Sequence, residues 1–183
     1  YSGYSAVLRA GNLKLRSGEA QAADEFSRTE GGFSRFNFDV NHVSKLSKVT
    51  QFYVFAHGQL ANRNLDSSEQ FYLGGADAVR AYPQGEAGGD SGYQATAELR
   101  YQTPVKGMSM TLFADVGEVL ARKDGDTSDP HCRLAGWGIG AVYSLDRSLY
   151  ARLDYARKIK GESYRSEAED KNGRLWFRLY KLF

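Results

Sequence analysis

The chain of 183 residues carries 24 Lys and Arg against 22 Asp and Glu, which gives a net charge of +2. This near balance argues against a nucleic-acid-binding protein, and the charged share of 25% is that of an ordered chain. A single cysteine, Cys132, excludes an intramolecular disulfide framework and a cysteine-rich metal cluster. No stretch approaches about 18 consecutive apolar residues, so we expect no transmembrane helix.

Glycine and aromatic residues are abundant in this chain, which contains 20 Gly, 12 Tyr and 10 Phe but 3 Pro. This composition is typical of a β-rich chain with many turns. The mean hydropathy of −0.52 is too low for a helical membrane protein. It is compatible with a transmembrane β-barrel, because a barrel strand needs apolar residues only at every second position.

Polar and apolar residues alternate with period 2 along much of the chain, the pattern of a strand with one polar and one apolar face. Between 35 and 42, for example, Phe36, Phe38 and Val40 interleave with polar residues. No segment has a convincing helical pattern. The alternation predicts eight strands of roughly 9–13 residues, long enough for a tilted strand to cross a bilayer. In chain order they cover about 4–16, 35–42, 49–61, 92–101, 108–117, 135–143, 148–155 and 174–183.

The connections between these predicted strands alternate between long and short. The long ones are charged and polar, whereas the short ones are tight turns. Outer-membrane barrels have short periplasmic turns and long external loops, so the alternation favours a membrane barrel. A soluble antiparallel sandwich or a lipocalin-like barrel remains the alternative, because period 2 alone does not say which face points outward. In chain order the connections are about 17–32, 44–48, 62–91, 103–107, 122–132, 145–147 and 160–172.

The third connection carries the most specific motif, LDSSEQFYLGGADAVRAYPQGEAGGDSGYQATAELRY over residues 65–101. It resembles the signature of two-partner secretion transporters of the haemolysin-activator and filamentous-haemagglutinin-exporter type, in the POTRA-plus-barrel superfamily. One position departs from the signature, since Ala81 stands where the family has Gly. If that position requires a positive φ, Ala81 is strained. The matching residues are Glu69, Phe71, Gly74, Gly75, Val79, Arg80, Tyr82, Gly89, Asp90, Gly92, Glu98 and Leu99.

A second motif, Phe113-x-Asp115-x-Gly117, also resembles this superfamily. The resemblance implies that the 62–91 connection folds back into the barrel lumen, where Arg80 pairs with Asp115. The alternation independently places Asp115 on the polar face of its strand. An arginine–carboxylate pair in a restricted lumen would be geometrically exacting, because the guanidinium fork can bind both carboxylate oxygens.

The C-terminal segment GRLWFRLYKLF provides a third likeness. A terminal Phe183 with Leu175, Phe177 and Leu179 upstream resembles the signal that the outer-membrane barrel assembly machinery reads. The resemblance therefore implies barrel assembly machinery and outer-membrane lipid as partners. The alternating connections place the C-terminus on the periplasmic side, because every long connection then lies outside. No nucleic-acid partner is expected.

Together these motifs imply that residues 1–183 form the C-terminal half of a sixteen-stranded antiparallel transmembrane β-barrel, with no POTRA domain in this chain. Tyr1 opens directly into a strand pattern with no signal peptide, which suggests a fragment or a processed chain. A closed barrel of eight strands is filled by side chains and would leave no room for the 62–91 connection. We therefore expect that the chain is not a self-sufficient unit.

The implied function is export of a large secreted exoprotein, of the haemolysin or adhesin type, across the bacterial outer membrane. The alternatives are a barrel insertion factor of the same superfamily and a passive pore. No catalytic residues, cofactor or metal are expected, since His131-Cys132 offers too few ligands and neither His42 nor His57 has a nucleophile motif nearby.

Two further sets of residues have a structural and a functional interpretation. Glycines at period 2 indicate a strand face that another element approaches closely, for which the folded-in connection is a candidate. Arginines on the polar faces line either a solvated wall or the path of an extended client chain. The glycines are Gly136, Gly138 and Gly140, and the arginines are Arg100, Arg152, Arg174 and Arg178.

Overall fold

A computed structural model describes residues 1–120, 131–145, 148–159 and 173–182. Three predicted features lie outside these residues in whole or in large part. They are the polar connections 122–132 and 160–172 and the terminal Phe183.

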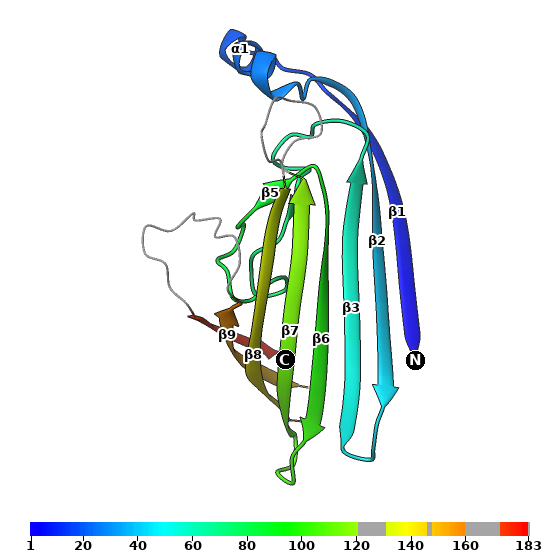
Figure 1. Cartoon of the computed structure of the whole chain (residues 1–183), viewed down its shortest axis with the longest axis vertical. Helices are drawn as coiled ribbons and strands as arrows, with labels where there is room; N and C mark the ends of the chain where they lie inside the picture. The colour runs from blue at the N-terminus through cyan, green and yellow to red at the C-terminus, as the bar shows by residue number, and fades with distance from the viewer. Residues whose placement is uncertain (121–130, 146–147, 160–172, 183) are drawn as a thin grey trace.

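The eight predicted strands are confirmed, and they form one antiparallel sheet (Figure 1). The order in the sheet is β1-β2-β3-β6-β7-β8-β9-β10, so β1 and β10 occupy the two edges. The all-β antiparallel prediction is therefore correct, with the sheet open over the described residues. The strands are β1 (Ser2–Leu13), β2 (Gly31–Lys45), β3 (Thr50–Ala61), β6 (Ser91–Gln102), β7 (Met108–Leu120), β8 (His131–Leu145), β9 (Leu149–Lys158) and β10 (Gly173–Lys181).

The two faces of the sheet differ sharply in burial. On β7, Phe113 and Asp115 are buried, whereas Leu112 and Val116, the residues on either side of this pair, are 52% and 45% exposed. We call the face that carries Asp115 the loop face and the opposite one the open face. An extended apolar surface that is not covered by protein is typical of the lipid-facing side of a barrel. Exposed apolar residues of the open face include Phe36, Val40, Leu60, Leu99, Met110, Leu112, Val116, Ile139, Leu153, Leu175 and Phe177.

The expectation that the chain has no helix is wrong at one place, because α1 (Gly18–Ser27) lies in the first long connection. Ser17 caps its N-terminus by accepting a hydrogen bond from the Ala20 amide at 3.2 Å. Arg28 ends it in the left-handed region, at φ 52°. The helix buries no residue, so it has no apolar periodicity for a pattern search to find. Over the described ranges, no helix has both the length and the apolar content to cross a membrane.

Asp24 ties the end of α1 to the residues that follow it. Its carboxylate accepts hydrogen bonds from the Thr29 hydroxyl, the Thr29 amide and the Ser27 hydroxyl, at 2.7, 2.6 and 2.8 Å. These donors, led by the Thr29 hydroxyl, hold the pKa of the Asp24 carboxyl below its ordinary value. A lowered carboxyl pKa adds stability that is complete above the ordinary Asp range, about 3.9, and is lost as the pH falls below it.

The first prediction concerns this carboxylate. Asp24→Asn is expected to speed amide hydrogen exchange over residues 24–30 at pH 7, because a neutral amide accepts more weakly and brings an unpaired donor. The difference from the wild type should shrink as the pH falls below about 4. Glu25→Gln is the matched control, since Glu25 is an exposed carboxylate on the same helix. Equal exchange in the two variants at pH 7 would contradict the prediction.

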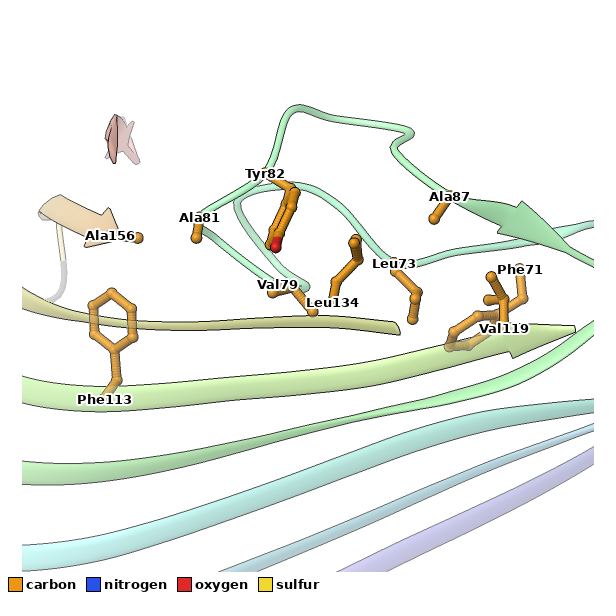
Figure 2. Packing of buried hydrophobic residues seen from close by; sticks show 10 residues of the cluster. All are labelled: Phe71, Leu73, Val79, Ala81, Tyr82, Ala87, Phe113, Val119, Leu134 and Ala156. Carbon is orange, nitrogen blue, oxygen red and sulfur yellow. The ribbon is translucent and has the colours of Figure 1, made fainter. Parts of the chain in front are cut away.

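The connection from β3 to β6, residues 62–90, packs against the loop face. It contains the two-residue strands β4 (Phe71–Tyr72) and β5 (Gly88–Gly89), which pair with each other. Figure 2 shows its apolar side chains gathered on one side of β7 and β8. The main hydrophobic core thus lies between this loop and the sheet. Loop members of the core are Phe71, Leu73, Val79, Ala81, Tyr82 and Ala87, and sheet members are Phe113, Val119, Leu134 and Ala156.

Candidate functional site

The structure brings Arg80, at the tip of the 62–90 loop, against Asp115 of β7. Arg80 Nε donates to Asp115 Oδ2 at 2.9 Å, and Nη2 donates to Oδ1 at 2.7 Å. The backbone amide of Arg80 donates to the same Oδ2 at 3.1 Å. Side chain and main chain of one loop residue are therefore both fixed by one carboxylate. Such a bidentate pair is strong and directional, and lysine cannot reproduce it.

Arg80 has further partners on neighbouring strands. Its Nη1 donates to Glu98 Oε1 of β6 at 2.8 Å and lies 3.9 Å from Asp154 Oδ1 of β9. The guanidinium carbon stands 3.4 Å from the ring centroid of Phe113, a cation–π contact. Arg80 is 3% exposed and Asp115 1% exposed, so the cation is buried and depends on its carboxylates for compensation.

Two more arginines complete this cluster. Arg152 bridges Glu98 Oε1 at 2.9 Å and Asp154 Oδ2 at 2.7 Å, and Arg100 bonds Glu98 Oε2 at 2.7 Å. The sequence left open whether these arginines form a solvated wall or a client path. In the structure they neutralise buried carboxylates, so the cluster carries matched charges rather than a free basic surface. Its members are Arg80, Arg100, Arg152, Glu98, Asp115 and Asp154.

The remaining predicted arginines lie on β10. Arg178 forms an ion pair with Asp77 of the loop, and its Nη2 lies 3.7 Å from Asp154 Oδ2. The Arg174 guanidinium lies 5.8 Å from the centroid of the Trp176 ring. Both arginines face the same side of β10 as Trp176.

Small residues let the loop approach the sheet this closely. A Cβ at Gly136 of β8 would stand 2.6 Å from Ala81 Cβ, and one at Gly117 of β7 would stand 2.6 Å from Leu73 Cδ2. Gly117 thus explains the third position of the Phe113-x-Asp115-x-Gly117 motif: a side chain there would displace the loop. Of the period-2 glycines, Gly136 meets the loop, while Gly138 accommodates the Phe113 ring from within the sheet.

Ala81 does not have the backbone conformation that would strain it. Among the non-glycine residues that the structure describes, a positive φ occurs at Arg28 and Ala87. Ala81 therefore has a negative φ, and its methyl group packs in the core at 1% exposure. The condition for strain at this position is not met.

The other predicted loop residues build the framework that holds the tip. The Val79 amide donates to the Leu73 carbonyl at 2.8 Å, and the Tyr82 amide donates to the Val79 carbonyl at 3.1 Å, which closes a compact turn around Arg80. Gly74 lets the two arms of the loop meet, since a Cβ there would lie 2.2 Å from the Pro83 carbonyl oxygen. Gly75 has a φ of +140°, in the region that favours glycine.

At the base of the loop, Asp90 is fully buried. Its carboxylate accepts from the Leu65 amide at 3.0 Å and from the Gln70 side chain at 3.2 Å. Gly92, the second residue of β6, lies next to Phe71, whose ring would stand 3.1 Å from a Cβ at this position. These contacts tie the first part of the loop, at Leu65 and Gln70, to its end at Asp90.

The predicted barrel-assembly residues have a different location. Leu175, Phe177 and Leu179 all lie on the open face of β10 and are 63%, 65% and 57% exposed. Their fourth member, Phe183, is outside the described residues. The structure does not bring this set near the Arg80 cluster.

Sequence reasoning missed some partners of Arg80. Trp176 of β10 donates from its indole Nε1 to the Arg80 carbonyl oxygen at 2.7 Å. Sequence reasoning also missed Asp154 on β9, whose Oδ1 lies 3.9 Å from Arg80 Nη1. The sequence did offer one signal. Glu98 and Arg100 are two residues apart, as are Arg152 and Asp154, so each pair of opposite charges shares one face of its strand. Using it requires the strand register and the path of the loop, and the sequence specifies neither.

Known proteins match both the sequence and the fold. The sequence pattern of the haemolysin secretion/activation proteins ShlB/FhaC/HecB matches residues 5–143. The chain belongs to this family. Members of the family are two-partner secretion transporters, not enzymes, and they belong to the outer membrane.

Individual relatives in this family cover part of the chain. The heme/hemopexin transporter proteins HuxB of two Haemophilus influenzae strains (ATCC 51907 / DSM 11121 / KW20 / Rd and 86-028NP) are each 32% identical over 111 residues. That stretch is 58% of this chain and 20% of each relative, so the chain spans about a fifth of their length. The structure of CdiB from Acinetobacter baumannii matches with a TM-score of 0.64 at 18% identity. That match covers 84% of this chain and 27% of CdiB, and it shows that the two chains share a fold.

Proposed function

We propose that this chain is part of an outer-membrane transporter that exports a large exoprotein, of the haemolysin or adhesin type, by two-partner secretion. Membership of the secretion/activation family supports the proposal. The observation that carries it is the buried contact of Arg80 with Asp115 and Glu98, which fixes a long loop on one face of the sheet.

The distribution of polarity supports a lumen on the loop face. The open face presents apolar side chains across the sheet, as a lipid-facing surface requires. The loop face carries buried ion pairs, which a bilayer would not tolerate in contact with lipid tails. In this arrangement the 62–90 loop lies inside the barrel. The C-terminus of β10 then lies on the periplasmic side, and α1 lies in an external connection.

The space around the loop suits an extended polypeptide. A cavity of about 460 Å³, lined by polar and apolar side chains, lies between the loop and strands β1, β2 and β3. Its walls offer amide, carboxylate and guanidinium groups, which can form hydrogen bonds with the main chain of an unfolded client. Such bonds do not depend on the sequence of the client. A second cavity, of about 280 Å³, lies beside the Arg80 cluster. The first is lined by Arg9, Arg35, Asn37, Asp39, His57 and Gln59, and the second by Tyr53, Asp77, Arg80, Arg100, Tyr150 and Arg178.

Comparison of cells with and without the complete protein tests this function. Mass spectrometry of the cell surface and the culture medium is expected to show loss of one large exoprotein when the transporter is absent. Other outer-membrane barrels should keep their abundance. A general fall in those barrels would instead indicate an insertion factor, and solute conductance with no change in secreted proteins would indicate a passive pore. The barrel assembly machinery and outer-membrane lipid remain proposed partners during insertion.

A further inference from the structure

The edge strand β10 makes two contacts with the tip of the 62–90 loop. The Trp176 indole N–H donates to the Arg80 carbonyl oxygen at 2.7 Å. Arg178 forms an ion pair with Asp77, three residues before Arg80. Within the described sheet β10 pairs with β9. The two loop contacts therefore add to the strand pairing that holds β10.

The same loop residue is held from both sides. The backbone amide of Arg80 donates to Asp115 of β7, while its carbonyl accepts from Trp176 of β10. In the sheet, β8 and β9 lie between these two strands. The loop tip thus bridges β7 to β10 across the loop face. If the tip moves away from the sheet, the hydrogen bond from the Trp176 indole to the Arg80 carbonyl and the ion pair of Asp77 with Arg178 are both lost.

We propose that Trp176 and Arg178 are positioning residues that couple the loop tip to β10, so that displacement of either loosens the other. If the loop moves to let a client pass, the contacts of Trp176 and Arg178 with the loop would break, and β10 would become less stable. This consequence for export rests on the proposed function, whereas the coupling itself does not. Both contacts come from side chains on one face of β10, at positions two residues apart, as strand geometry requires.

Hydrogen exchange of the full-length protein in detergent micelles tests one direction of the coupling. Trp176→Phe keeps an aromatic ring and removes the indole donor. Exchange of the amides 78–82 is expected to rise between about twofold and tenfold, the range for loss of one net hydrogen bond. Trp137→Phe is the matched control, because Trp137 lies on the open face at 46% exposure. Unchanged exchange at the tip in Trp176→Phe would overturn the proposal.

The reverse direction uses a change in the loop. Asp77→Asn removes the partner charge of Arg178, and exchange of the amides of β10 is expected to rise while exchange of β6 and β7 stays as in the wild type. A purely local role for Asp77 would leave β10 unchanged and would also overturn the proposal. Export measured in parallel separates the two ideas: intact coupling in a protein that exports nothing contradicts the proposed function alone.

Discussion

Replacing Arg80 by alanine in the complete protein is expected to abolish export while the barrel remains in the membrane. The change removes the three side-chain hydrogen bonds that hold the loop tip on β7 and β6. It leaves the buried Asp115 with the Thr96 hydroxyl and the backbone amide of residue 80 as donors, but without the guanidinium that compensates its charge. Breaking a buried pair in this way costs about 3–5 kcal/mol, enough to release the loop from the sheet. The strand pairings do not involve Arg80, so the barrel should lose much less abundance than activity.

Two further variants sharpen this test. Arg80→Lys keeps the charge but cannot bind both Asp115 oxygens and Glu98 together, so export should stay below about a tenth of the wild-type level. Arg157→Ala is the control, because Arg157 lies exposed on the open face of β9. The readouts are exoprotein at the cell surface and barrel content of the outer membrane. Normal export by Arg80→Ala at normal abundance would refute a role for the Arg80 cluster.

The sequence predicted the sheet well because its signal is local. Alternation along each strand depends only on which residues face lipid and which face the interior, and β7 shows the two patterns side by side. The helix α1 was missed for the opposite reason, since it buries nothing and its signals are a cap at Ser17 and three nearby alanines. Short solvent-exposed helices depend on such caps and on propensity rather than on periodicity.

The site was predictable only in part. The pairing of Arg80 with Asp115 came from resemblance, and alternation could support it because Asp115 has a fixed face. The partners Glu98, Asp154 and Trp176 depend on how four strands align and on where the loop ends. Trp176 is separated from Arg80 by 96 residues. Neither spacing nor composition relates such distant positions, so their contact becomes visible only in the folded chain.

A glycine and an alanine provide the most specific test of the docked loop. Gly136→Ala places a methyl group 2.6 Å from Ala81 Cβ, closer than two methyl groups can pack. Overpacking of this kind costs about 1–3 kcal/mol and should push the tip away from β8, with a matching loss of export. Gly18→Ala is the control, because a Cβ there meets no atom within 4 Å.

The compensating change makes the prediction directional. Ala81→Gly removes the opposing methyl group, so the double variant Gly136→Ala with Ala81→Gly is expected to recover most of the export that Gly136→Ala loses. Ala81→Gly alone should lose less export than Gly136→Ala, since it removes one buried methyl group without creating a clash. It should bring no gain, because Ala81 has no positive φ from which glycine could relieve strain. Recovery would be a coupling between two contacting residues, which distant sites do not show. Export measured for the four proteins at equal barrel abundance decides the outcome: if the losses simply add, Ala81 does not rest on Gly136 in the working transporter.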